Sequence, residues 1–218
     1  MSDELTYKGL TPNGLAFFEV KADDGKISKK IFHGIRCGLS WPCIANPGGY
    51  CCLVGQETAR LITGQYPVSV LFEKESLTMG DLFSTMFDQM GYYGCTDIYS
   101  DLSPRFNSFI LALDSTRRQT RPNQRITLKM APYCGSFLHG LELIKKWLRE
   151  VKALNIPRGT RIQQELREIK ETDLKGDPED RFYGINGLRY ALGAVETTEI
   201  LQPSKVENVK PLNPAAWT

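Results

Sequence analysis

The order in which strand-like and helix-like segments follow one another constrains the fold of this chain more than any other feature. Between residues 50 and 131, runs with a strand-like apolar pattern alternate with segments whose apolar residues recur at helical spacing. Beyond residue 136 only the helical spacing recurs. This order predicts an α/β protein built on one sheet, with helices packed against it.

The predicted elements can be placed approximately. The strands cover residues 50–55, 58–62, 67–73, 95–99 and 125–131, and the helices cover 78–94, 106–113, 137–152, 160–169 and 178–195. Three antiparallel strands, a helix, a strand, a helix, a strand and terminal helices is the element order of a ribonuclease H-like fold. We therefore predict a mixed five-stranded sheet flanked by helices.

Two appendages flank this predicted domain. The strand-like segments Leu15–Lys21 and Ile27–Ile35 are separated by a turn signal and predict a β-hairpin, followed by a loop rich in proline and glycine. The C-terminal residues contain three prolines and no apolar period. We expect an N-terminal extension over residues 1–48, the ribonuclease H-like domain over 49–200 and a proline-rich arm over 201–218.

Composition excludes several other classes. With 218 residues, 41% hydrophobic and 24% charged, the chain can bury a core of ordinary size, so disorder and collagen-like or coiled-coil structure are excluded as global descriptions. The longest uncharged stretch, 37–56, contains Pro42 and Pro47 and is not expected to cross a membrane as a helix. The N-terminus begins with acidic Asp3 and Glu4 and lacks a basic segment that leads into an apolar one, so we expect an intracellular protein.

Charged residues are nearly balanced, at a formal net charge of +2, but they are clustered. Basic residues gather in 26–30, 117–125 and 145–167, and acidic residues gather in 173–180. Separate basic surfaces and an acidic cluster suit an enzyme that grips a polyanion around a metal centre, although solvated helix faces give the same pattern. The residues expected to hold a phosphate backbone are Lys145, Lys146, Arg149, Arg158 and Arg161.

The carboxylates at the predicted element ends indicate a metal site. In the predicted sheet the first and fourth strands are neighbours, and the last helix brings further acids to the same edge. Clustered carboxylates bind Mg²⁺ or Mn²⁺, and two such ions can activate water for phosphodiester cleavage. We predict a metal-dependent endonuclease with Asp101 and Asp180 as the principal ligands. Asp97, Asp177 and Glu57 are the further candidates.

Each of these acids also has a structural interpretation. Asp177 or Asp180 can cap the last helix, and Asp101 can cap the helix that starts near Ser103. Asp97 and Glu57 can be ordinary strand-end residues, and Glu73 and Glu75 compete with Glu57 for its role. Arg181 and Arg189 can neutralise the acids, contact phosphate or form surface ion pairs.

The six cysteines point to reduced thiols rather than a disulfide framework. Their spacing does not match a zinc finger or ribbon, so a zinc site formed by Cys37, Cys43 and either His33 or His139 is a minor alternative. A cysteine hydrolase based on Cys134 and His139 is weaker still, because no orienting partner or oxyanion hole is evident near them.

Residues 156–196 have the sequence IPRGTRIQQELREIKETDLKGDPEDRFYGINGLRYALGAVE. This segment resembles the C-terminal end of the nuclease domain in the large subunit of tailed-phage terminases. Such domains are ribonuclease H-like and often close with an acidic pair, a small gap and an "ALRYA"-type helix. Asp177 and Asp180 stand near the position of the acidic pair, and Leu188–Ala191 match the helix.

The resemblance implies a nuclease that cuts viral DNA, expected to be double-stranded, during genome packaging in the host cytoplasm. Terminase large subunits also carry an ATPase with a GxxxxGK[ST] loop, and this chain contains no such sequence. A packaging ATPase or a portal-type protein on another chain is therefore the implied partner. The alternative interpretation is a non-catalytic nucleic-acid-binding or assembly module on the same fold.

Overall fold

In the computed structural model the chain is described over residues 4–21, 25–42, 48–62, 64–133, 135–175 and 177–201, with side chains as far as residue 195. The strands within these ranges are β1 (Glu4–Leu10), β2 (Ala16–Lys21), β3 (Ile27–Ser40), β4 (Gly49–Glu57), β5 (Val68–Ser76), β6 (Asp97–Ser100), β7 (Thr127–Met130) and β8 (Leu154–Asn155). The α-helices are α1 (Met79–Tyr93), α2 (Asn107–Thr120), α3 (Phe137–Arg149), α4 (Arg161–Glu168) and α5 (Tyr183–Leu201), and the short 3₁₀ helices are η1 (Pro104–Phe106), η2 (Glu171–Lys175) and η3 (Pro178–Asp180).

The centre of the sheet has the strand order β5-β4-β3-β6-β7. β3, β4 and β5 form an antiparallel meander, whereas β6 pairs parallel to β3 and β7 pairs parallel to β6. This order and these directions are those of a ribonuclease H-like sheet, so the predicted fold class is confirmed. β8 adds a short parallel segment to the outer edge of β5.

The identity of the first two core strands differs from the prediction. The first core strand is β3, which the sequence analysis assigns to the N-terminal hairpin, and β4 is the second. Residues 58–62 form no strand and instead connect β4 to β5 by a turn in which the amide of Leu61 donates to the carbonyl of Gln65 at 2.8 Å. The apolar side chain of Ile62 is fully exposed there, so its hydrophobicity is not a sign of a buried strand.

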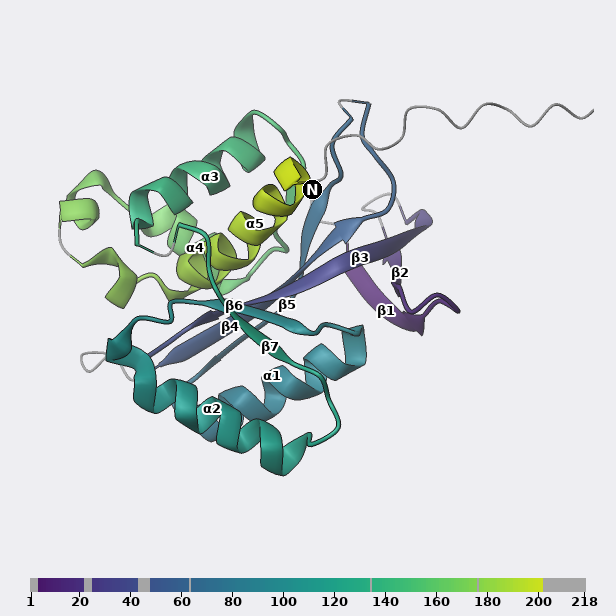
Figure 1. Ribbon diagram of the computed structural model, residues 1–218. Coiled ribbons are helices and arrows are strands. Elements are labelled where there is room, and N and C mark those ends of the chain that lie inside the picture. Colours follow the sequence, from purple (N-terminus) through teal and green to yellow (C-terminus); the bar gives the residue numbers. More distant parts are fainter. Residues whose placement is uncertain are drawn as a thin grey trace, which may run out of the picture.

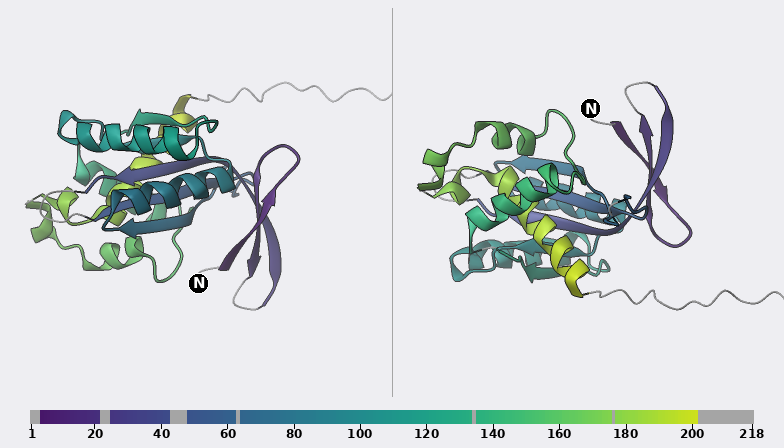
Figure 2. Two further views of the ribbon diagram at one scale, coloured as in Figure 1. Left: turned by 90° about the horizontal axis from the view of Figure 1, so that it is seen from below. Right: turned by 90° about the horizontal axis from the view of Figure 1, so that it is seen from above.

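The predicted N-terminal hairpin is confirmed as the pair β2–β3, and β1 adds a third strand to it. β3 therefore has two parts: its first half pairs with β2, and its second half pairs with β4 and β6. A register shift between His33 and Arg36 separates the two halves, and Gly34 adopts a φ of 55° there. The hairpin projects beyond the helical layers, as Figure 2 shows. The division of the chain at residues 48 and 200 stays a prediction.

Helices cover both faces of the sheet (Figure 1). α1 and α2 pack on one face, and α3, α4 and α5 pack on the other. Each face of the sheet has its own hydrophobic core. Cys51 lies in the core under α1 and α2, and Cys52 lies in the core under α3, α4 and α5, as expected for neighbours on one strand. No helix in the described part of the chain combines the length and the apolar character needed to cross a lipid bilayer.

α5 is the helix closest to the sheet, and glycines make this approach possible. A Cβ atom added to Gly38 of β3 would lie 1.8 Å from the carbonyl oxygen of Gly187 in α5. A Cβ atom on Gly187 would in turn lie 2.8 Å from the ring of Tyr50. The backbone of α5 is thereby held directly over β3, and the segment that precedes α5 is brought to the end of that strand.

Candidate functional site at the ends of β3 and β6

The parallel pairing of β3 and β6 brings their C-terminal ends together. The hydroxyl of Ser100, the last residue of β6, donates to the carbonyl oxygen of Leu39 at 2.5 Å. The indole Nε1 of Trp41, which follows β3, donates to the carbonyl oxygen of Asp101 at 2.6 Å. Asp101 is therefore fixed beside the end of the central strand.

Both carboxylate oxygens of Asp101 have partners within the chain. Oδ1 accepts a hydrogen bond from the amide of Ser103 at 2.8 Å, which is the local capping contact that the sequence analysis gives as the structural interpretation. Oδ2 lies 3.3 Å from Nη2 of Arg105, on η1. Asp101 is buried, and these two contacts provide hydrogen-bond partners for its buried carboxylate oxygens.

The second acid of the site is Glu179, in η3. Its Oε2 atom lies 3.1 Å from Nη2 of Arg105, and its Oε1 atom lies 2.5 Å from Nη2 of Arg189. The side-chain amide of Asn186 donates to the carbonyl oxygen of Glu179 at 2.7 Å, which fixes the backbone. Asp101 and Glu179, far apart in sequence, thus converge on a single nitrogen atom of Arg105.

Arg189 holds Glu179 from the interior of the protein. Its side chain is fully buried, its Nε donates to Asn186 at 2.9 Å, and its Nη1 donates to the carbonyl oxygen of Tyr133 at 2.8 Å. α3 leaves room for this side chain with Gly140, where a Cβ atom would lie 2.5 Å from Cδ of Arg189. Arg189 therefore forms a buried ion pair, and not the surface ion pair that the sequence analysis considers.

Arg105 differs from Arg189 in its exposure. About half of its side chain, 49%, is accessible to solvent, and its guanidinium lies 4.6 Å above the ring of Phe106. Partial burial alone would lower the pKa of Arg105, but the charges of Asp101 and Glu179 outweigh that effect and raise it. Arg105 is thus a permanent cation placed between two carboxylates.

The donor chemistry of this site fits one divalent cation. Asp101 Oδ2 and Glu179 Oε2 both lie within hydrogen-bonding distance of the same nitrogen, so one cation at that place meets two hard oxygen ligands. The buried hydroxyl oxygen of Ser103 has no hydrogen-bond partner among the described residues and is a further unused oxygen nearby in sequence. The described residues contain no cluster of three or more potential ligands of the His, Cys, Asp or Glu type.

The remaining acids of the last segment lie close to Glu179. Asp177 is exposed and, together with Glu179, lines a cavity of about 330 Å³ between η3 and the start of α3. Asp177 forms no side-chain cap on η3, so the structure does not show the capping contact considered for it. The amide of Asp180 donates to the carbonyl oxygen of Asp177 at 3.2 Å. The role of Asp177 and Asp180 as ligands stays a prediction.

Two of the predicted acids lie elsewhere on the sheet. Glu57 pairs in register with Phe32 at the opposite end of β4, about 25 Å from Ser40 at about 3.3 Å per residue, and it forms an ion pair with Lys30 at 2.7 Å. Asp97 begins β6 instead of ending it and forms an ion pair with Lys129 at 2.8 Å. Glu57 is thus separated from Asp101 because β4 runs antiparallel to β3, and Asp97 lies at the opposite end of β6 from Asp101. The role of both as metal ligands stays a prediction.

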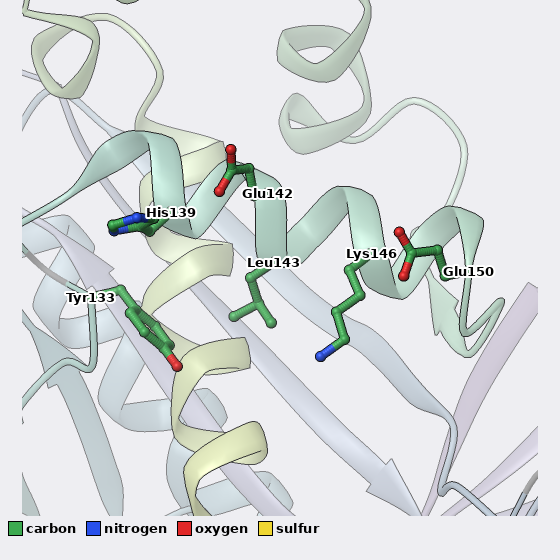
Figure 3. Close-up of a pocket in the computed structure, with 6 residues that line it drawn as sticks. All are labelled: Tyr133, His139, Glu142, Leu143, Lys146 and Glu150. Atoms are coloured by element: carbon green, nitrogen blue, oxygen red, sulfur yellow. The ribbon is translucent and has the colours of Figure 1, made fainter.

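The predicted phosphate-contacting residues divide into two groups. Lys145, Lys146, Arg149 and Arg158 are exposed. Lys146 lines a cavity of about 420 Å³ with Tyr133, His139, Glu142, Leu143 and Glu150, and Figure 3 shows Leu143 and Lys146 extending from α3 toward the side on which Tyr133 lies.

Arg161, in contrast, forms contacts that hold α4 against neighbouring elements. Its Nε donates to the buried carboxylate of Glu165 at 2.8 Å, and its amide donates to Glu73 at 2.8 Å. Glu165 in turn accepts the amide of Ile185 at 2.8 Å and thereby caps the start of α5. Burial raises the pKa of Glu165, and the Arg161 charge opposes that shift.

The described cysteines are core residues. Cys37, Cys51, Cys52 and Cys95 are buried free thiols, and burial raises the pKa of Cys95 to about 12. A thiol with this pKa is protonated at neutral pH and is neither a nucleophile nor a ready metal ligand. Cys43 and Cys134 lie outside the described residues, so the zinc and cysteine-hydrolase alternatives that require them stay untested.

Neither protein-family models nor curated proteins match this sequence. Among solved structures, the chain is similar to the large terminase nuclease from thermophilic phage G20c with bound zinc. The superposition covers 86% of this chain and 90% of the G20c chain, with 12% sequence identity and a TM-score of 0.48. A second structure of the large terminase nuclease from this phage has the same coverage, with 15% identity and a TM-score of 0.45. Both are terminase nucleases, the family that residues 156–196 resemble.

Proposed function

We propose that the chain is a metal-dependent endonuclease that cleaves DNA phosphodiester bonds with a divalent cation, Mg²⁺ or Mn²⁺, held between Asp101 and Glu179. The observation that carries this proposal is the convergence of the two carboxylates, from the end of β6 and from η3, on one cationic atom at the edge of a ribonuclease H-like sheet. A divalent cation held there would polarise the phosphate and lower the pKa of a bound water.

The chain's own residues would orient the substrate and the ligands. The amide of Ser103 fixes Asp101, and the buried guanidinium of Arg189 fixes Glu179, so neither carboxylate needs to reorganise when a cation binds. The exposed basic residues of α3 and the following loop, Lys145, Arg149 and Arg158, are the candidates for contacts with the DNA backbone.

The biological setting is part of the same proposal. The resemblance of residues 156–196 to terminase large subunits supports double-stranded viral DNA as the substrate, genome packaging as the process and the host cytoplasm as the location. A separate packaging ATPase or a portal-type protein would then be the partner that moves the DNA.

Incubation of the full chain with supercoiled plasmid and Mn²⁺ tests this function. We expect nicked and linear DNA from the wild type, and none from Asp101→Asn or Glu179→Gln. Asp114→Asn is the matched control, because Asp114 lies on α2 and pairs with Arg117 and Arg118 outside the site. Persistent cutting by Asp101→Asn would refute the proposal. If Asp180→Asn loses cutting and Glu179→Gln does not, Asp180 and not Glu179 is the metal ligand.

A non-catalytic DNA-binding or assembly module is the second candidate, and one observation favours it. The central strand ends in Ser40, so β3 contributes no carboxylate, and all four carboxylate oxygens of Asp101 and Glu179 already have partners in the chain. In the plasmid assay such a module would retard DNA in a gel without nicking it.

A further inference from the structure

Arg105 lies between the two carboxylates of the candidate site. Arg105 is the one residue that contacts both Asp101 and Glu179 among the contacts described above, and it uses the same nitrogen, Nη2, for both. A guanidinium presents several donors, so this sharing is not forced by a lack of other N–H groups. The two carboxylates are thus arranged around one point in space, and a positive charge belonging to the protein occupies that point.

We propose that Arg105 is an internal counter-ion that competes with divalent metal for Asp101 and Glu179, so that metal binds only when this side chain swings out. The proposal rests on the metal-dependent function proposed above and adds the way in which the site is kept closed. A divalent cation and the guanidinium cannot share the position, because both need Asp101 Oδ2 and Glu179 Oε2 as their direct partners.

The two arginines of the site differ in the way that such a device requires. Arg189 is fully buried and bonded to Tyr133 and Asn186 as well as to Glu179, so it cannot leave without disrupting α5. Arg105 is half exposed, and its side chain starts from a 3₁₀ helix of three residues. Because the guanidinium is already half in water, moving it outward costs little for Arg105 itself, and an incoming divalent cation would replace the positive charge beside the buried carboxylate of Asp101.

The occupant that would release Arg105 follows from its chemistry. A guanidinium binds phosphate as well as carboxylate, in a bidentate manner. A DNA phosphate on the solvent-exposed side of Arg105 would offer its guanidinium an alternative partner and leave the two carboxylates to the metal. On this account DNA and metal enter the site together.

Direct measurement of Mn²⁺ binding tests the proposal without reference to catalysis. Titration calorimetry with Mn²⁺ alone compares the full-length wild type with Arg105→Gln, and Arg118→Gln on α2 is the matched control because its side chain is exposed and pairs with Asp114. We expect Arg105→Gln to bind Mn²⁺ about two- to fivefold more tightly than the wild type, as expected for the loss of a partly exposed competing charge. Arg118→Gln should bind like the wild type.

Two further variants keep the test specific. Adding Asp101→Asn to Arg105→Gln should abolish the gain in affinity, and Arg105→Lys, which keeps the charge, should not show it. Equal or weaker Mn²⁺ binding by a folded Arg105→Gln protein, or a gain that survives Asp101→Asn, would overturn the proposal. If Arg105→Gln does not fold, the Mn²⁺ affinity of the wild type and of Arg105→Lys is measured with and without a double-stranded oligonucleotide. A higher Mn²⁺ affinity of these proteins in the presence of the oligonucleotide supports the proposal, and an unchanged affinity overturns it.

The outcome is distinguishable from that of the proposed function. A gain in Mn²⁺ affinity without any plasmid nicking upholds the role of Arg105 and refutes the nuclease. Nicking by the wild type together with unchanged Mn²⁺ affinity in Arg105→Gln upholds the nuclease and refutes the role of Arg105.

Discussion

At the scale of single residues, Arg189 is expected to contribute strongly to stability, because its charge is fully buried and paired. Replacement by leucine leaves Glu179 without its closest cation and the carbonyl of Tyr133 without a donor. We expect Arg189→Leu to lower the free energy of unfolding by about 3–5 kcal/mol, the usual cost of breaking a buried ion pair. Urea denaturation followed by circular dichroism measures this change.

The matched control is Arg118→Leu, whose side chain is 73% exposed and paired with Asp114. It should cost no more than about 1 kcal/mol, because exposed ion pairs contribute little. Similar losses in the two variants would show that the Arg189–Glu179 pair does not carry the stability assigned to it.

Of the two acids that contact Arg105, the sequence selects Asp101 as a candidate ligand, whereas Glu179 is not selected from the acidic cluster 173–180. Asp101 is predictable because it follows a short apolar strand, a place where many active-site acids lie. Glu179 is flanked by Asp177 and Asp180, and which of three neighbouring acids in a short 3₁₀ helix faces inward depends on packing that composition does not encode. The one available signal is Arg189, the single charged residue in the segment 182–195, because a charge buried there requires an acid nearby.

At the scale of elements, the contact between β3 and α5 places the whole site. Its closeness depends on Gly38, where a Cβ atom would lie 1.8 Å from the backbone oxygen of Gly187. Gly38→Ala must push the helix away from the strand, and we expect it to lower the free energy of unfolding by about 3 kcal/mol. Thermal or urea unfolding of the purified variant provides the measurement.

Gly80→Ala serves as the control for this change. Gly80 lies exposed in the first turn of α1, and a Cβ atom there meets no other group. Because alanine favours helix over glycine, this variant should be more stable by up to about 1 kcal/mol. A Gly38→Ala protein as stable as the wild type would mean that β3 and α5 separate easily.

The helices were largely predictable from sequence, whereas the role of β3 was not. Apolar residues at helical spacing indicate a helix from local sequence alone, and α1 and α3 lie close to their predicted ranges, whereas α2 extends to Thr120, beyond its predicted end at residue 113. The identity of the first core strand depends on its parallel pairing with β6, about sixty residues later, and local patterns contain no information on such pairing. Gly34 and the exposed first half of β3 also weaken its apolar pattern.

At the scale of the whole molecule, the two hydrophobic cores share the same sheet. Trp41 lies in the core under α1 and α2, and Trp147 lies in the core under α3, α4 and α5. Because β4 contributes Cys51 and Leu53 to one core and Tyr50, Cys52 and Val54 to the other, we expect neither core to lose its packing while the other keeps its own. We expect one cooperative unfolding transition for the described domain.

Two variants with a single reporter in each core measure this. Trp147→Phe and Trp41→Phe, each combined with Trp217→Phe, leave fluorescence from one core at a time. Within each variant the urea midpoint from fluorescence should coincide with the midpoint from far-UV circular dichroism. A separation of the two midpoints in either variant would show that the faces of the sheet unfold independently.

The register shift at Gly34 has a consequence for how much this chain tolerates changes in its length. A residue inserted before Gly34 moves the side chains of the first half of β3 to the opposite face of the hairpin. The second half of β3 keeps its register, because the irregular position at Gly34 absorbs the extra residue before the strand enters the core. The same insertion after Arg36 would exchange the inward-facing and outward-facing side chains in the half of β3 that pairs with β4 and β6, and would disturb the contact of Trp41 with Asp101. Within β3, therefore, an insertion that the fold tolerates before Gly34 is expected to prevent folding when it is placed after Arg36, about two residues later.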